Sequence, residues 1–421
     1  MKNNKQKKTI AIFTAVMLII ILLFATNLVS SDCAPIQYPS GKSGHSMVYD
    51  SINDVIIIYG GTTYLEWQYM KYDTKAYDYN DNTWIYLTPS GTPYQSSWGA
   101  MAYDSESAKT ILFGGTANPT TTNGYETDET WAYDYVVNTW IKKNPAESPD
   151  NRTGFCMAYD SESDVIIMHG GGVGWFNPNV EDLHYNDTWA YDFNTDTWTN
   201  MNPTGLDIGL AEAQMTYDSE SDRIIMFGGY FISPYDGDPQ EEYYSTETWA
   251  YDYNTNTWEN ITTTIHPDLR VDHALAYDSE SDRVILTGGW NMTTYGTSKI
   301  DPRSDETWAF DYNTQTWENM NPTSQPGRFQ HKMAYDSESD LIIFFGGIND
   351  TERRTPYNEI HTYDYNSNNW TLISSELCPT KTDYIFIFPI VSLFTILAFT
   401  IILKRKKISH LSSFQEKIKI I

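Results

Sequence analysis

The sequence predicts an all-β protein made of six similar four-stranded units, and three recurring residue types support this fold class. A tyrosine marks each unit, at intervals of 54, 56, 58, 60 and 58 residues: Tyr49, Tyr103, Tyr159, Tyr217, Tyr277 and Tyr335. A glycine pair follows each tyrosine: Gly60-Gly61, Gly114-Gly115, Gly170-Gly171, Gly228-Gly229, Gly288-Gly289 and Gly346-Gly347. A tryptophan closes each unit: Trp84, Trp140, Trp198, Trp258, Trp317 and Trp370. Self-similarity at this period indicates a propeller or a solenoid.

Within one unit, from Met215 to Trp258, the residue pattern indicates strands and turns rather than helices. The apolar run Ile224–Phe227 is short and is bounded by a polar turn and by glycines, which is typical of a buried strand. The residues from Trp249 to Tyr253 alternate with period two, as in a strand that faces two environments. Polar turn residues at Ser219–Ser221 and Thr255–Thr257 predict two hairpins, so that one unit contains four antiparallel strands.

The glycine pairs have a structural interpretation. Glycine tolerates a positive φ angle and lets a neighbouring aromatic ring approach the backbone. A phosphate-binding role would need a helix after the glycines, and the sequence predicts none there.

Units of this kind, with a glycine pair after the second strand and a tyrosine and a tryptophan in the strands that follow, resemble the kelch repeat. The resemblance extends from Ser43 to about Trp370 and implies a closed six-bladed β-propeller, similar to the central propeller of galactose oxidase. We expect the propeller to span residues 32–378, with blades at about 41–88, 96–144, 152–202, 210–262, 270–321 and 328–374.

Apolar segments near both termini predict attachment to a membrane. Residues 1–31 combine basic residues with the apolar run Ile10–Phe24, as in a signal peptide, and an uncleaved anchor is the alternative. Residues 384–403 are long and apolar enough to form a transmembrane helix. The basic segment 404–421 is then a cytoplasmic tail by the positive-inside rule. We therefore expect a single-pass cell-membrane protein (two-pass if the first segment is retained) with an extracellular propeller.

The charge of the chain excludes one class of partner. The formal net charge is −28, and the basic residues of the two terminal segments leave the part between them still more acidic. Such a surface repels nucleic acid. The acidic Asp-Ser-Glu-Ser-Asp turns lack an EF-hand ligand pattern, and Ala108 replaces the last acid in the second unit. We expect neither a bound metal nor a cofactor.

Binding residues are expected on one face of the propeller. Turns between strands one and two, and between strands three and four, are nearly constant and share one face. The connections between strands two and three vary and share the other face with the linkers, and variable loops on a rigid scaffold commonly form binding sites. Aromatic residues are frequent there, which suits recognition, although packing of the loops on one another is an alternative role. The leading candidates for ligand contact are Trp67, Trp175, Tyr235 and Trp290.

A second set of candidates is cationic. Seven residues before the marker tyrosine stand Lys42, Arg152, Arg270 and Arg328, and three histidines stand four residues before it: His45, His273 and His331. Arginine and histidine at the first strand are common in kelch families, and the resemblance implies that this strand lines the central channel. The cations are then expected near one mouth of the channel, where they either hydrogen-bond linker carbonyls or capture an anionic ligand.

The sequence favours a non-catalytic function. It contains no Gly-x-Ser-x-Gly, His-Glu-x-x-His or Walker motif, and it lacks the repeated Asp-x-Gly turns of sialidases. We therefore expect a cell-surface recognition or adhesion module that binds a protein or a glycan. One alternative is an extracellular glycan-processing hydrolase or oxidase that uses the channel mouth. Another is a purely structural envelope component.

Cysteine and asparagine positions suggest covalent modification. The linkers between units have nearly constant length and are therefore expected to follow the same path. Along this path, Cys33 and Cys378 are expected at the seam between the sixth and first blades, where a disulfide would help to close the ring. An intermolecular disulfide or two free thiols are the alternatives, and Cys156 is expected to be buried. Asn-x-Ser/Thr sequences mark candidate glycosylation sites: Asn151, Asn186, Asn260, Asn291, Asn349 and Asn369.

Overall fold

A computed structural model describes residues 39–63, 71–117, 125–174, 183–232, 242–292, 304–349 and 355–373. They belong to one compact unit, Gln37–Ile373. All regular secondary structure in these ranges is β-strand.

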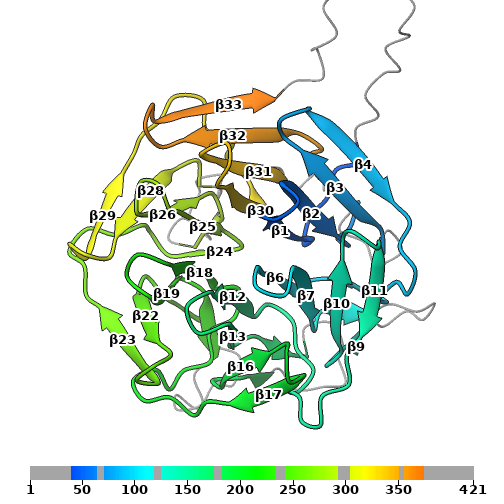
Figure 1. Ribbon diagram of the computed structural model, residues 1–421. Helices are drawn as coiled ribbons and strands as arrows, with labels where there is room; N and C mark the ends of the chain where they lie inside the picture. The colour runs from blue at the N-terminus through cyan, green and yellow to red at the C-terminus, as the bar shows by residue number, and fades with distance from the viewer. Residues whose placement is uncertain are drawn as a thin grey trace, which may run out of the picture. The chain divides into compact units, whose positions relative to one another are not determined.

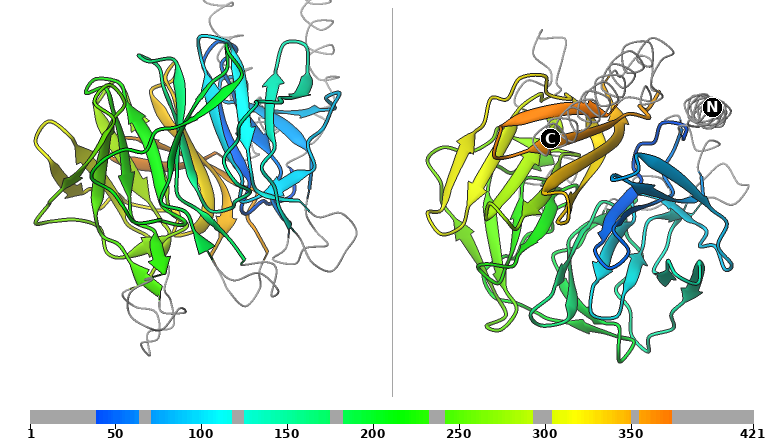
Figure 2. Two further views of the ribbon diagram at one scale, coloured as in Figure 1. Left: turned by 90° about the horizontal axis from the view of Figure 1, so that it is seen from below. Right: turned by 45° about the horizontal axis from the view of Figure 1, so that its top comes forward.

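Six four-stranded antiparallel sheets stand side by side around a central channel (Figures 1 and 2). The first strand of each sheet lies nearest the axis and the fourth lies at the rim. The predicted six-bladed propeller with four antiparallel strands per blade is therefore confirmed.

Each blade takes its strands in chain order. The strands of blades 1 to 3 are β1 (Ser46–Asp50), β2 (Val55–Tyr59), β3 (Thr74–Asp78) and β4 (Thr83–Leu87); β6 (Ala100–Asp104), β7 (Lys109–Phe113), β10 (Thr130–Asp134) and β11 (Thr139–Lys142); and β12 (Cys156–Asp160), β13 (Val165–His169), β16 (Thr188–Asp192) and β17 (Thr197–Asn200). Those of blades 4 to 6 are β18 (Gln214–Asp218), β19 (Arg223–Phe227), β22 (Thr248–Asp252) and β23 (Thr257–Ile261); β25 (Ala274–Asp278), β26 (Arg283–Thr287), β28 (Thr307–Asp311) and β29 (Thr316–Asn319); and β30 (Phe329–Asp336), β31 (Leu341–Ile348), β32 (Ile360–Asp364) and β33 (Asn369–Ile373).

Small additional sheets lie where the chain enters a blade or leaves its second strand. They are formed by β5 (Gln95–Ser97) with β8 (Thr116–Ala117) and β9 (Tyr125–Glu126), β14 (Gly172–Val173) with β15 (Leu183–His184), β20 (Tyr230–Ile232) with β21 (Glu242–Tyr244), and β24 (Arg270–Val271) with β27 (Trp290–Asn291).

The hydrophobic core lies between blades. Second strands such as β2 are buried along their whole length, because both of their faces contact a neighbouring sheet. One cluster joins Ile57 of blade 1 to Leu112 and Trp140 of blade 2. Another joins Ile58 of blade 1 to Phe345 of blade 6, so the core is continuous across the seam where the chain begins and ends its circuit.

The glycine pairs hold successive blades together. The N–H of the second glycine donates to a backbone carbonyl of the following blade: Gly115 to Arg152 at 2.9 Å, Gly171 to Leu210 at 2.9 Å, Gly229 to Arg270 at 3.1 Å, Gly289 to Arg328 at 2.8 Å and Gly347 to Lys42 at 2.8 Å. The last of these bonds crosses the seam. We call this contact the glycine clasp.

Steric space and backbone conformation explain why glycine is needed in the clasp. Gly346 and Gly347 have φ angles of 76° and 78°, a region that disfavours other residues. A Cβ atom on Gly346 would lie 2.5 Å from the carbonyl oxygen of Lys42, and one on Gly114 would lie 2.7 Å from the ring of Phe155. The interpretation of the pair as structural, with a close aromatic neighbour, is consistent with these contacts.

A second set of five backbone hydrogen bonds lies around the axis, at or just before the start of the first strands. In each of these bonds the N–H of one blade donates to the carbonyl of the preceding blade: Trp98 to Gly44, Gly154 to Trp98, Glu212 to Gly154, Gln330 to Asp272, and Gly44 to Gln330 across the seam. All six residues have φ between 54° and 65°, so at each of them a left-handed conformation turns the backbone into the channel wall. The ring is thus closed by polar contacts as well as by the core.

The closing tryptophans connect the blades near the rim. In five blades the indole Nε1–H donates to a threonine hydroxyl on the third strand of the preceding blade: Trp140 to Thr74, Trp198 to Thr130, Trp258 to Thr188, Trp317 to Thr248 and Trp370 to Thr307, at 2.8–3.1 Å. At the seam, Ile360 takes the place of the threonine, and the Trp84 Nε1–H has no partner among the described residues.

The segments near both termini lie outside the described ranges. They include the predicted signal peptide or anchor, the predicted transmembrane helix at 384–403, and both Cys33 and Cys378. In the part of the chain that the structure describes, there is no helix long and apolar enough to span a bilayer.

The tryptophan–threonine contact generates a stability prediction. Thr130→Val keeps the shape of the side chain but leaves the buried Trp198 Nε1–H without an acceptor. We expect the free energy of unfolding of the purified chain to fall by about 1–3 kcal/mol, measured by chemical denaturation. Thr130→Ser retains the hydroxyl and should cost clearly less. Equal losses in the two variants would show that the hydrogen bond is unimportant.

Candidate functional site

The linkers and the loops that follow the glycine pairs share one face of the ring, which we call the loop face. The entry to each blade pairs with residues just after the glycines, as in the bridges Ser43–Thr62 and Thr153–Gly172 and the strand pair β24–β27. The opposite face carries the hairpin turns between strands one and two and between strands three and four, and we call it the turn face. Figure 2 shows the ring from two further directions.

Neighbouring loops contact one another on the loop face. The Gly174 N–H donates to Glu126 of blade 2 at 3.3 Å. The His184 ring packs edge-on against Tyr230 of blade 4, with 5.0 Å between ring centroids. These contacts join the loop bases of blades 2, 3 and 4 into one surface that is organised before any ligand binds.

Aromatic pairs build the raised hairpin of blade 4. Phe231 stacks on Tyr243 across β20 and β21 with ring centroids 5.5 Å apart, and Tyr230 lies 5.6 Å from Tyr244. Cross-strand aromatic pairs stabilise a two-stranded hairpin and at the same time present ring surface to solvent. Of the two roles that the sequence suggested for the loop aromatics, these contacts show packing, and recognition stays a prediction.

Large exposed side chains mark the part of the loop face that sequence reasoning did not single out. Tyr94 is 74% exposed, and Tyr125 and Leu183 are each 51% exposed. Tyr94 also lies against Tyr72, with ring centroids 6.1 Å apart. These residues lie at positions that do not recur from unit to unit, and that irregularity is the signal that could have identified them.

The predicted aromatic candidates have different outcomes. Trp290 is half-buried and packs edge-on against Phe329 of blade 6, with 4.8 Å between ring centroids. It therefore helps to join two blades as well as lying at the base of a loop. Trp67, Trp175 and Tyr235 lie outside the described residues.

The cationic candidates show one of the two expected roles, because Arg152 donates to the linker carbonyl of Asp150 and Arg270 to that of Asp268, both at 3.0 Å. They do not line the channel, and each is buried inside its own blade. Arg152 makes a bidentate ion pair with Asp187, at 2.6 and 2.9 Å, donates to the carbonyl of Gly170 and lies over the ring of Tyr185. Its guanidinium thus fixes the glycine pair to the start of the third strand.

The other three cations repeat this arrangement. Arg270 donates to the Gly288 carbonyl and pairs with Glu306 at 2.7 Å. Arg328 donates to the Gly346 carbonyl and pairs with Glu359, and Lys42 donates to the Gly60 carbonyl and pairs with Asp73. Because their charges are already compensated, the contacts favour the structural interpretation over capture of an anionic ligand.

Ionisation follows from this burial. Burial lowers the pKa of Lys42 to about 8, although the neighbouring Asp73 carboxylate opposes the shift. Burial alone would raise the pKa of Asp187, but the hydrogen bonds and charge of Arg152 hold that pKa below its usual value. Asp187 is therefore a charged partner of Arg152 near neutral pH.

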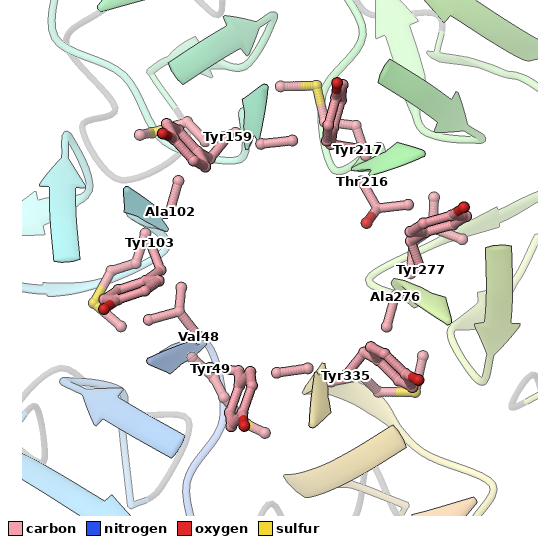
Figure 3. A pocket seen from close by; sticks show the side chains of 18 of the residues that line it. Val48, Tyr49, Ala102, Tyr103, Tyr159, Thr216, Tyr217, Ala276, Tyr277 and Tyr335 are labelled. Carbon is pink, nitrogen blue, oxygen red and sulfur yellow. The ribbon is translucent and has the colours of Figure 1, made fainter. Parts of the chain in front are cut away.

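The central channel encloses a cavity of about 390 Å³. Its wall is formed by first strands, from which Val48, Ala102, Thr216 and Ala276 point toward the axis, while the marker tyrosines lie between successive blades (Figure 3). Lys332 extends across blade 5 to donate to the side-chain oxygen of Gln214 at 3.0 Å. Turn serines such as Ser161 and the marker tyrosines also line the cavity, so its wall is polar as well as apolar.

Three histidines contact the preceding blade close to the channel. His45, His273 and His331 are almost fully buried, and none of their ring nitrogens has a hydrogen-bond partner within the described ranges. A Cβ atom on Gly288 would lie only 2.6 Å from the His331 ring. Burial holds the pKa of all three imidazoles well below the usual value, so they are neutral packing residues.

The remaining candidates concern covalent modification. Cys156 is a free, buried thiol, and burial raises its pKa to about 12. Asn151, Asn186, Asn260 and Asn369 are exposed and Asn349 is half-buried, whereas Asn291 is buried and donates to Asp268. Burial does not favour modification of Asn291. Within the described ranges, no group of three or more His, Cys, Asp or Glu side chains could hold a metal ion.

Comparisons with known proteins agree with this architecture. A family model described as the attractin/LZTR1 β-propeller matches residues 143–382, and one described as the KLHDC2/KLHL20/DRC7 kelch-repeats domain matches residues 21–229. Kelch domain-containing protein 10 of Homo sapiens is 24% identical over 337 residues, which cover 75% of this chain and 68% of that protein.

Two further relatives show similar or shorter matches. Kelch domain-containing protein 10 of Rattus norvegicus is 25% identical over 337 residues, covering 75% of this chain and 74% of that protein. Mei4-dependent protein 6 of Schizosaccharomyces pombe is 22% identical over 214 residues, covering 47% of this chain. The matched stretch spans 28% of the length of that yeast protein.

The buried histidines generate a pH prediction. Between about pH 7 and pH 5 an unfolded histidine gains a proton, since its ordinary pKa is near 6.5, while the folded imidazoles stay neutral. Unfolding therefore takes up protons, and stability falls as the pH falls, by up to about 1.4 kcal/mol per pH unit for each histidine.

Phenylalanine replaces histidine at the equivalent position of blade 3, Phe155, so the triple variant His45→Phe, His273→Phe and His331→Phe should fold. We expect the dependence of the free energy of unfolding on pH between 7 and 5 to become about half as steep in this variant, because His169, His184 and His361, whose pKa burial lowers to about 4, remain. His266→Gln, a change in a linker, is the control and should keep the slope. An unchanged slope in the triple variant would refute the assignment.

Proposed function

Because this chain belongs to the kelch-repeat β-propeller family, we propose that it is a non-catalytic recognition module that binds a protein or glycan ligand through its loop face. Kelch propellers are typically protein-interaction modules. The observation that carries the proposal is the loop face itself, where aromatic side chains that do not recur between units project from loops that contact one another. Such a surface pays little conformational entropy on binding.

The difference between repeated and unrepeated polar residues supports this choice of face. The repeated cations and acids are paired within blades, as Arg152 is with Asp187. The exposed tyrosines at positions 94 and 125 lie on the face that varies. Tyrosine and tryptophan are enriched among residues that dominate binding energy, because they bury a large area and retain a polar group.

We place this recognition at the cell surface. The apolar segments at 10–24 and 384–403 and the basic segment 404–421 support a propeller held outside the membrane with a cytoplasmic tail. The net charge of −28 suits an extracellular domain that remains soluble and does not associate with anionic lipid or nucleic acid.

A binding screen tests the proposed function. The purified chain is applied to arrays of glycans and of cell-surface proteins, and alanine variants are compared for each ligand found. We expect at least one of six alanine substitutions to weaken binding by roughly 30-fold or more, as for an interface hot spot. The six substituted residues are Trp67, Tyr94, Tyr125, Trp175, Tyr235 and Trp290.

The matched control is Glu162→Ala, on the turn face, which should leave the affinity unchanged. Unchanged binding in all six loop variants would contradict the proposal. Turnover of a glycoside or of an oxidase substrate by the purified chain would replace it with the enzymatic alternative.

A further inference from the structure

On the turn face, five blades contain the same polar contact between their two hairpin turns. The aspartate five residues after the marker tyrosine accepts the tyrosine hydroxyl on one oxygen and an asparagine amide on the other. In blade 4, Asp222 accepts from Tyr217 at 2.9 Å and from Asn254 at 3.0 Å. The aspartates are Asp54, Asp164, Asp222, Asp282 and Asp340, and the asparagines are Asn80, Asn194, Asn254, Asn313 and Asn366.

Blade 2 lacks both members of this contact. Ala108 stands in place of the aspartate and Val136 in place of the asparagine, and Val137 follows where the other units have a polar residue. As a result, the buried hydroxyl of Tyr103 makes no hydrogen bond of normal geometry to any residue that the structure describes. Val136 is 76% exposed and Val137 is 64% exposed, so the apolar residues do not form internal packing instead.

In the adjacent turn of blade 1, an apolar residue also replaces a polar one. Ile52 is 60% exposed and occupies the position at which the other five units have a glutamate: Glu106, Glu162, Glu220, Glu280 and Glu338. The Tyr103 hydroxyl lies beside the Asp50 carboxylate and the backbone N–H of Ile52. Tyr135, next to Val136, lies near Asp50 and Asp78 of blade 1. The altered turns therefore flank one junction between blades, and strands β1 and β6 on its two sides are neighbours (Figure 1).

We call Ile52, Ala108, Val136 and Val137 the turn patch. The fold does not require it, because the five other blades meet the same need with polar side chains. Ile52, Val136 and Val137 are each more than half exposed on turns that flank one junction, and exposed apolar side chains grouped on a monomer commonly mark an interaction site. From this break in the repeat we propose that the turn patch is a second docking site, distinct from the loop face, for a protein segment in which an aliphatic side chain is flanked by lysine or arginine.

Charge selects the class of partner. Acidic side chains lie near the turn patch, with Glu106 and Asp81 exposed on the same pair of blades, and Lys109 beside Ala108 is already paired with Asp134. A basic segment gains favourable electrostatic attraction there and is steered toward the patch. A second copy of this chain would bring another strongly acidic surface, since the net charge is −28, and the repulsion disfavours it as the occupant.

The test uses a variant that restores the pattern of the other five blades. It combines Ile52→Glu, Ala108→Asp, Val136→Asn and Val137→Thr, and it should fold because each new residue occupies its usual place in the repeat. A random peptide library is selected on the wild-type chain, and the enriched peptides are then measured against both proteins. We expect enriched peptides with an aliphatic residue beside lysine or arginine, and binding to the restored variant that is weaker by roughly tenfold or more.

The controls separate the two faces. Tyr125→Ala on the loop face should leave binding of these peptides unchanged, and added salt should weaken it. The inference is overturned if no enriched peptide distinguishes the wild-type chain from the restored variant, or if those that do are acidic. It is also overturned if the wild-type chain forms a dimer that the restored variant does not, because the occupant is then a second copy. None of these outcomes depends on what binds the loop face.

Discussion

The structure depends on the glycine clasp, the hydrogen bond that the second glycine of five of the six pairs donates to a carbonyl of the next blade. The close approach of two blades at this bond explains three observations together. The bonds are 2.8–3.1 Å long, both glycines have positive φ angles, and there is no room for a Cβ atom. When a cation precedes the first strand, its side chain holds the carbonyl of its own glycine pair while its backbone carbonyl receives the clasp of the preceding blade, as Arg270 does with Gly288 and Gly229. The cation that precedes the first strand thereby connects three strands and two blades.

The fold was largely predictable because the repeat imposes the same demands six times. The spacing of Tyr49, its glycine pair and Trp84 was enough to indicate four strands per unit, and recurrence removed the usual ambiguity of short apolar runs. The role of the cations was not predictable in the same way. The sequence shows that Arg152 carries a charge but does not show that Asp187, 35 residues later, already compensates it within the folded blade.

The positions that break the repeat distinguish scaffold from candidate interaction surfaces. Residues that recur, such as the acidic turns and the histidines near the channel, have partners or packing roles within the fold. Exposed residues that do not recur occur on both faces: Tyr94 lies on the loop face and Val136 lies on the turn face. Recurrence across six units therefore separates residues that the fold needs from residues that it does not need. The loops on which Trp67, Trp175 and Tyr235 lie were identified in this way, but they fall outside the described residues.

The central claim is that the glycine clasp closes the ring at the seam as firmly as it joins the other blades. Hydrogen exchange of backbone amides, resolved to single residues, measures this directly. We expect the Gly347 amide, bonded to Lys42 across the seam, to exchange as slowly as those of Gly171 and Gly289 within the ring. Exchange at Gly347 that is much faster than at both of these positions would contradict it, because the ring would then open between blades 6 and 1.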